Sequence, residues 1–307
     1  MGKRLLQTVP LLVVMLFVVY ALVRVAPGDP AQTLLGLHAT PARVAHLDKE
    51  LGVDKPLLKG YLSYAWGALH GDLGNSVKAQ QPVATIISNR LGVSVWLLAG
   101  AMLLSLLGAI PLALLAALRQ GRSADHGIRM VSVLGLTIPT FWLGLVLVSF
   151  FALPTGLFPV SGFGQGVVGH LHSIFLPALT LAIGIAPIQI RALRLSLIGV
   201  LDSDFIATVR AMGLRERRVL MRHVLPNAVS ASLTLLAAQL GVILFGEVIV
   251  ENTFALPGIG QAMVQAIIQR DYPVVQGLTL AAALLVVGMN LLADVLQVAL
   301  DPRVELR

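Results

Sequence analysis

Few side chains in this chain could take part in chemistry, because 57% of its 307 residues are hydrophobic and only 12% are charged. His170 and His172 are of metal-ligand type, but two histidines without a nearby third ligand make a poor metal site. The chain has no cysteine, which excludes disulfides, thiolate metal ligands and a cysteine nucleophile. It also has no G-x-x-x-x-G-K-[ST] phosphate-binding loop. We therefore expect no catalytic residue, no metal and no cofactor bound by the chain itself.

Polar residues are rare within the long apolar stretches of the sequence. They are Gln189, Gln239, Glu247, Asn290 and Asp294. In a membrane such groups usually face a bundle interior or a cavity, and the alternative is hydrogen bonding between helices. We predict that Gln239 and Glu247 line a polar path or its gate, whereas Asn290 and Asp294 favour helix–helix contacts.

The stretch from Asp204 to Ala228 differs from its surroundings because it gathers arginines between apolar stretches. The arginines are Arg210, Arg215, Arg217, Arg218 and Arg222. Phe205, Val209 and Met212 lie at i, i+4 and i+7, which predicts an apolar stripe on a short first helix. A second, basic helix should follow and continue into the next apolar stretch, with Pro226 in its first turn.

Two further signals predict where the first of these helices begins and ends. Asp202, Ser203 and Asp204 offer capping oxygens at its start. Gly213 can adopt the left-handed conformation that ends a helix. We refer to residues 204–224 as the basic hairpin.

Three interpretations of the basic hairpin are possible. A solvated loop whose arginines only set topology would need neither a stripe nor caps. A helix-turn-helix that binds DNA would need a small soluble domain around it, and the chain has no residues left to build one. A short amphipathic helix presented to a soluble partner accounts best for the pattern.

The remaining sequence predicts a membrane protein, since a soluble domain carries about 25% charged residues and the mean hydropathy here is +0.86. Six stretches are long enough to span a bilayer, at about 20 residues each. They are Leu5–Val25, Val93–Leu118, Val131–Leu153, Ile174–Ile190, Ala228–Val250 and Leu278–Leu300. Pro257, Gly258 and Gly260 mark a tight outer loop after the fifth stretch, which we expect at the outer gate.

The distribution of lysine and arginine predicts the orientation. Basic residues gather in the connections that are cytoplasmic if the N-terminus is inside, above all between Arg191 and Arg222. We therefore expect both termini in the cytoplasm. The chain divides into an N-terminal membrane helix (1–26), an extracytoplasmic loop with short helices (27–90), a five-helix core (91–300) with a cytoplasmic loop (195–227), and a cytoplasmic tail (301–307).

The basic hairpin resembles the EAA loop of permease subunits of ATP-binding-cassette (ABC) importers. That pattern is Glu-Ala-Ala, three residues, Gly, nine residues, Ile, one residue and Leu-Pro. Gly213 and Leu225-Pro226 match it in position, whereas Ala207 stands at the glutamate and His223 at the isoleucine. The looser form in dipeptide, oligopeptide and nickel permeases fits better, since "TVRAMGL" (Thr208–Leu214) is similar to their T-A-R-A-K-G-L.

Further segments along nearly the whole chain are similar to the same subfamily. They are "VRVAPGDPA", "ELGVDKPL", "GDLGNS", "VIVENTFALPGIG", "RDYPVVQG", "NLLADVL" and "LDPR". The resemblance implies the fold of a type I importer permease: an all-α polytopic protein of the bacterial inner membrane, with six transmembrane helices and a cytoplasmic coupling-helix loop.

The resemblance also implies partners and contact residues. The partners are a second permease subunit, two cytoplasmic ATPase subunits that carry ATP and Mg, and an extracytoplasmic substrate-binding protein. The residues expected to contact the ATPase are Ala207, Thr208, Val209, Arg210, Ala211, Gly213 and Leu214. Short peptides are favoured over nickel as the substrate. The alternative is a permease of the same family that imports nickel or another solute. A self-sufficient secondary transporter, a different class, would need coupling-ion sites and usually inverted repeats, and no repeat is visible.

Overall fold

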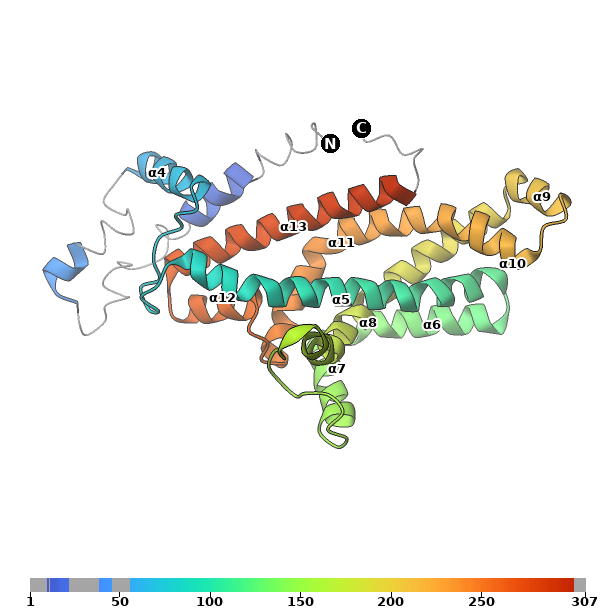
Figure 1. Cartoon of the computed structure of the whole chain (residues 1–307), viewed down its shortest axis with the longest axis horizontal. Helices are drawn as coiled ribbons and strands as arrows, with labels where there is room; N and C mark the ends of the chain where they lie inside the picture. Colours follow the sequence, from blue (N-terminus) through green and yellow to red (C-terminus); the bar gives the residue numbers. More distant parts are fainter. Residues whose placement is uncertain (1–9, 11, 22–38, 46–55, 301–307) are drawn as a thin grey trace. The chain divides into compact units, whose positions relative to one another are not determined.

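The structure, a computed structural model, describes residues 10, 12–21, 39–45 and 56–300. Within these ranges nothing is described of the side chains of 230–234, 236–238, 294 and 296–300. The described residues are predominantly helical and contain no strand, only an isolated bridge between Asn75 and Pro82. Figure 1 shows the helices in chain order. The all-α fold class predicted from the sequence is confirmed.

The chain forms two compact units. The first comprises residues 1–94 and 257–287, and the second comprises residues 95–256 and 288–307. The first unit contains a short apolar helix at Leu12–Ala21, α4 (Leu57–Leu69), the start of α5 (Val83–Leu118), α12 (Ile259–Ile268) and the start of α13 (Tyr272–Leu300).

Aromatic contacts fasten α4 to the short apolar helix in the first unit. The Tyr61 hydroxyl donates a hydrogen bond of 2.9 Å to the Val13 carbonyl, and the Tyr61 ring packs edge-on against Phe17. The short helices predicted in this loop include α4, in which Tyr61 is buried, whereas Leu58 and Leu62 are 63% and 58% exposed. The face of α4 that carries Tyr61 therefore makes the contact.

The second unit holds the rest of α5 and the helices that pack on it. These are α6 (Ser123–Thr137), α7 (Thr140–Leu147), the π-helical turn η2 (Val148–Ala152), α8 (Gly166–Leu201), α9 (Asp204–Ala211), α10 (Glu216–Val219), the π-helical turn η3 (Leu220–Val224) and α11 (Leu225–Thr253). Helix α8 packs extensively against α11 and also against α6 and α7. Alanines of α5 (Ala109, Ala113 and Ala117) join the core with α8, because small side chains let helices approach closely.

The third predicted span is not one continuous helix. Helices α6 and α7 are bent by 102° at the break before Thr140. Ile138 is extended there, at φ −78° and ψ 122°, because the ring of Pro139 disfavours a helical conformation in the residue before it. The prediction of a single helix over Val131–Leu153 was therefore wrong.

Three helices of the described residues are long and apolar enough to cross a membrane: α5, α8 and Tyr272–Ala293 of α13. The bent pair of α6 with α7 and η2 would make a fourth span if it is counted as one. The predicted span Leu5–Val25 lies partly outside the described residues, and so do many side chains of the predicted span Ala228–Val250. The number of six spans stays a prediction, and so does the division into domains at residues 26, 90 and 300.

Candidate functional site

The basic hairpin forms as two short helices joined at Gly213. Helix α9 ends at Ala211, Gly213 has φ +77°, and α10 begins at Glu216. The left-handed glycine predicted from the sequence is confirmed. From α10 the chain continues through η3 into α11 without leaving the helical conformation, with Pro226 in the first turn of α11. The hairpin is therefore a direct extension of a long apolar helix (Figure 1).

The predicted cap of α9 is absent. Ser203 stands at the N-cap, but its side chain caps no backbone N–H group. The Ser203 hydroxyl instead donates 2.7 Å to the Val200 carbonyl. The Ser203 backbone carbonyl accepts from the N–H groups of Ile206 and Ala207.

One face of the hairpin is buried in the core of the second unit. Ile206 is 0% exposed and Val209 is 6% exposed, and both pack in a cluster with Leu193 and Leu197 of α8. The same cluster contains Val219, Val224 and alanines of α5. The apolar contacts join the hairpin to three long helices, because α5, α8 and α11 all contribute to this cluster.

The other face of the hairpin is exposed. Of the residues predicted to contact an ATPase, five are exposed: Ala207, Thr208, Arg210, Ala211 and Gly213. Leu214 is half-buried against the core cluster. Val209 is buried within the chain, so it cannot contribute to a partner-facing stripe with Phe205 and Met212, which are 52% and 74% exposed. The predicted stripe was wrong because Ile206, beside Val209 on the helix surface, defines the buried side.

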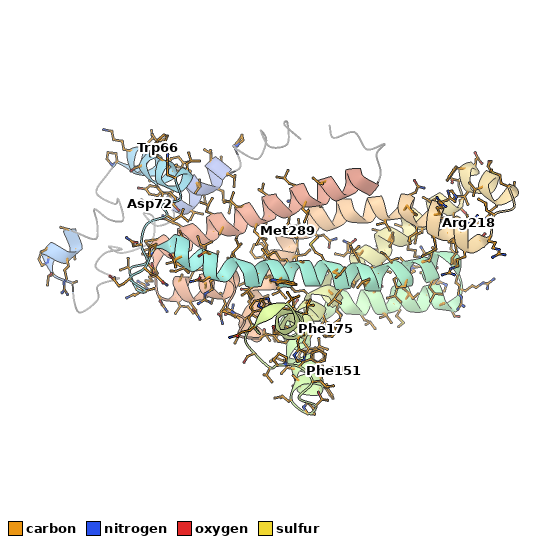
Figure 2. All side chains as sticks on the ribbon, viewed as in Figure 1. Trp66, Asp72, Phe151, Phe175, Arg218 and Met289 are labelled. Atoms are coloured by element: carbon orange, nitrogen blue, oxygen red, sulfur yellow. The ribbon has the colours of Figure 1, made fainter. Side chains whose placement is uncertain are left out.

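An ion pair between its two helices closes the hairpin. An Nη atom of Arg210 lies 2.7 Å from a carboxylate oxygen of Glu216, and both side chains are largely exposed. Hydrogen bonding to Arg210 lowers the pKa of the Glu216 carboxyl, although desolvation opposes it. The pair bridges the turn at Gly213. Figure 2 labels Arg218, which lies on the same hairpin.

Behind the hairpin lies a buried ion pair that sequence reasoning missed. Asp125 of α6 is 1% exposed and accepts two hydrogen bonds from the guanidinium of Arg194 on α8, at 2.7 and 2.6 Å. It also accepts one from the Gly121 N–H at 3.0 Å. Hydrogen bonding to Arg194 lowers the pKa of Asp125 to about 2, against the effect of burial. The sequence does carry a signal for this pair, because Asp125 is a single acid between Arg122 and Arg129.

The polar residues predicted to line a path lie in different environments. Gln239 is half-buried, and its amide donates 3.3 Å to the Leu235 carbonyl one turn earlier. Glu247 is 3% exposed, and its Oε1 has no hydrogen-bond partner among the described residues. Glu251, one turn later, is fully buried and was not singled out from the sequence. Gln189 is also fully buried on α8.

The other pair of predicted intramembrane residues is less informative. Asn290 is half-buried on α13, and the side chain of Asp294 lies outside the described part of the chain. The roles predicted for Asn290 and Asp294, like those of Gln239 and Glu247, stay predictions.

Pro257, Gly258 and Gly260 lie at the start of α12 in the first unit. Gly258 and Gly260 are buried, and Pro257 lines a polar cavity of about 480 Å³ with Arg90 and other residues. The N–H of Ile259 donates 2.9 Å to the Ser94 hydroxyl, which ties α12 to α5. A role of this turn in an outer gate stays a prediction.

The same cavity contains a second buried aspartate that was missed. Asp271 is 3% exposed and accepts a hydrogen bond of 2.5 Å from the Ser76 hydroxyl. The backbone N–H groups of Val77 and Lys78 donate to it at 3.3 and 3.1 Å. The carboxylate therefore fixes the turn after "GDLGNS" against the start of α13.

His170 and His172, the residues of metal-ligand type, contact aromatic rings. The His170 ring stacks on Phe163 with centroids 4.0 Å apart, and the His172 ring lies against Phe158. His172 also hydrogen-bonds with the Leu157 carbonyl. Within the described ranges, no group of three His, Cys, Asp or Glu side chains could hold a metal ion.

The fold and the hairpin together define a class of protein: a polytopic helical membrane protein that carries a structured hairpin at the end of a long apolar helix. The chain belongs to the family of binding-protein-dependent transport system inner membrane components. The model of that family matches residues 109–306, and the model of its N-terminal region matches residues 1–98.

Curated relatives and a solved structure are similar to the chain. A putative peptide transport system permease of Brucella abortus is 35% identical over 305 residues, covering 98% of this chain and 97% of its own. The oligopeptide transport system permease AppB of Bacillus subtilis and the dipeptide transport system permease DppB of Escherichia coli are each 33% identical, over 99% and 98% of this chain.

The solved structure shares the fold at low sequence identity. A chain of the MetNI methionine ABC transporter in an inward-facing conformation superposes with a TM-score of 0.58 at 16% identity. The match covers 70% of this chain and 96% of that one. This likeness bears on the fold alone.

Proposed function

We propose that this chain is the permease subunit of an ATP-driven importer of short peptides. The observation that carries the proposal is the basic hairpin, with one face in the core formed by α5, α8 and α11 and the other face exposed. A partner that moves the exposed face would therefore displace the ends of three long helices. The names of the relatives, which are peptide, dipeptide and oligopeptide permeases, support peptides as the substrate.

The proposal includes the partners and the orientation. The chain pairs with a second permease, binds two ATPase subunits through the hairpin, and receives peptide from an extracytoplasmic binding protein. ATP and Mg belong to the ATPase subunits. Both termini and the hairpin lie in the cytoplasm, because arginines gather there. Gln239 and Glu247 line the path, and the turn at Pro257, Gly258 and Gly260 belongs to the outer gate.

The hairpin is tested by a pair of glycine variants. Gly213 has φ +77° and open space where a side chain would lie, so Gly213→Val strains only the backbone, by about 1 kcal/mol or more. Gly199 of α8 also has open space, but no left-handed conformation, so Gly199→Val is the matched control. We expect Gly213→Val to lower peptide uptake and co-purification of the ATPase at equal membrane abundance. Wild-type behaviour of Gly213→Val would reduce the hairpin to a topogenic loop.

The substrate is tested by uptake in a strain that lacks the gene. Dipeptide and oligopeptide uptake should be lost and restored by the cloned gene, while nickel uptake should be unchanged. Loss of nickel uptake with normal peptide uptake would make the chain a nickel permease. Uptake by the purified chain alone from an ion gradient would instead make it a secondary transporter.

Cysteine labelling tests the orientation, since the chain has no native cysteine. Met212, in the hairpin, is 74% exposed, and Met212→Cys should react only from the cytoplasmic side. Lys55→Cys, in the loop predicted outside, should react only from the opposite side. The reverse pattern would invert the topology.

A further inference from the structure

A cavity between α6 and α8 in the second unit has a cationic part and an apolar part. Its volume is about 560 Å³, within the range of about 300–1,000 Å³ typical of small-molecule sites. The polar lining comes mainly from His126, Arg129, Arg191 and Arg194. This cavity has no part in the proposed coupling of the hairpin to an ATPase.

Two arginines of the cationic part are available to a ligand. Arg194 is paired with Asp125, a buried acid of α6. Arg129 and Arg191 are exposed, and neither has a carboxylate within 4.0 Å among the described residues. The cavity therefore keeps an excess of two positive charges.

The apolar part consists of side chains that are exposed within this chain. Met130, Val133 and Leu136 come from α6 and are 68%, 57% and 49% exposed. Ile188 and Leu195 contribute from α8, at 39% and 61%. Such side chains suit contact with an acyl chain, since lipid tails are as apolar as leucine.

The predicted spans place the two parts at different depths. Arg129 and Arg191 lie one or two residues outside the predicted spans Val131–Leu153 and Ile174–Ile190, on the side predicted to be cytoplasmic. Val133, Leu136 and Ile188 lie inside these spans. At the depth of these side chains the two helices approach closely, because a Cβ on Gly135 would lie 3.2 Å from the Pro187 ring. The charged part thus faces the headgroup region, and the apolar part faces the hydrocarbon.

We propose that this cavity binds one anionic phospholipid of the cytoplasmic leaflet, with its phosphate at Arg129 and Arg191 and an acyl chain along Val133, Leu136 and Ile188. Guanidinium groups bind phosphate oxygens with paired hydrogen bonds. Basic pockets between membrane helices on the cytoplasmic side suit anionic headgroups. A soluble anion would satisfy the arginines but leave the apolar side chains uncovered. The phospholipid alone matches both parts.

The test is a lipid titration of the permease complex by native mass spectrometry, with phosphatidylglycerol and phosphatidylcholine as probes. Arg129→Gln combined with Arg191→Gln should weaken phosphatidylglycerol binding about tenfold or more and change phosphatidylcholine binding little. Arg119→Gln combined with Arg122→Gln is the matched control, because it removes the same charge from residues that do not line the cavity. Arg129→Lys combined with Arg191→Lys should keep much of the selectivity.

A second pair of variants tests the apolar part without changing any charge. Val133 lines the cavity, whereas Val131 on the same helix is similarly exposed, at 69%, and does not. Val133→Trp should weaken phosphatidylglycerol binding, and Val131→Trp should not. Equal losses in both arginine double variants would overturn the proposal, and so would displacement of the lipid by excess inorganic phosphate. Displacement by a transported peptide would also overturn it and would assign the cavity to the substrate path.

Discussion

Asp125 and Asp271 are both buried carboxylates that hold a turn of the chain against a distant helix, but their partners differ. Asp125, in the second unit, is held by the guanidinium of Arg194, 69 residues away. Asp271, in the first unit, is held by the Ser76 hydroxyl, 195 residues away, and by two backbone N–H groups. The first contact matches two opposite charges, and the second satisfies a charge with neutral donors.

This difference determines what a substitution leaves behind. Removal of Asp125 leaves a guanidinium that is only 13% exposed. Removal of Asp271 leaves a hydroxyl and N–H groups that can turn to water if the loop opens. A buried charge without its partner costs more than a buried neutral donor without one. Asp125 should therefore affect the stability of the whole unit, and Asp271 the order of one loop.

The largest effect is expected from Asp125→Ala. Loss of one partner of a buried ion pair costs about 3–5 kcal/mol of unfolding free energy, and thermal unfolding of the purified complex measures it. The double variant Asp125→Leu with Arg194→Leu should recover most of the loss, because it removes both charges. A single variant as stable as wild type would show that water already solvates Arg194.

The ion pair of Asp125 and Arg194 should also make the stability of the protein depend on pH. The pKa of Asp125 is lowered from 3.8 to about 2 in the folded protein. The stabilisation is thus complete above the unfolded pKa and is lost as pH falls through the folded value, between about pH 4 and 2. The shift corresponds to about 2 kcal/mol. The difference in unfolding free energy between wild type and Asp125→Asn should shrink as the pH falls through this range. A difference that does not change with pH would contradict this prediction.

A smaller effect is expected from Asp271→Asn, which keeps the shape but loses the charge. The hydrogen bonds to a charged acceptor weaken, and we expect a loss of about 1–2 kcal/mol. Faster proteolysis of the loop around Ser76 should report the change. Asp72→Asn is the control, because Asp72 is exposed and accepts a hydrogen bond from the Gly74 N–H nearby. Equal proteolysis in both variants would remove the distinction between them.

The smallest effect is expected at the exposed pair of the hairpin. Arg210 and Glu216 are 42% and 53% exposed, and water screens such pairs. Arg210→Gln should change the unfolding free energy by less than about 0.5 kcal/mol. The change should shrink further at high salt. A loss comparable to that of Asp125→Ala would mean that the pair is buried in the assembled complex.

Local signals in the sequence were sufficient for part of the hairpin. The glycine turn at Gly213 and the proline at the start of α11 were both predicted, because each depends on the backbone of one residue. The buried face of α9 was not predicted. Phe205, Ile206, Val209 and Met212 are all apolar, and only the packing of α8 and α5 selects Ile206 and Val209.

The effect of a proline on the apolar helices also could not be predicted from the local sequence. Pro139 ends α6, whereas Pro177 and Pro187 lie inside the continuous helix α8. The residue type is the same, and each proline removes one backbone donor. The most apolar 18 residues of α8 are 67% buried inside the chain, and neighbouring helices can accommodate a proline. The fate of a proline therefore could not be predicted from its position in an apolar stretch.

The sequence by itself determined that this is an all-α membrane protein and that a basic hairpin interrupts its apolar stretches, because composition and helical periodicity are properties of the chain alone. Only the tertiary structure decided which charges are buried together. Asp125 and Arg194, and likewise Asp271 and Ser76, are far apart in the sequence. No local pattern connects such residues, since a buried carboxylate is satisfied by whichever donors the packed helices bring to it.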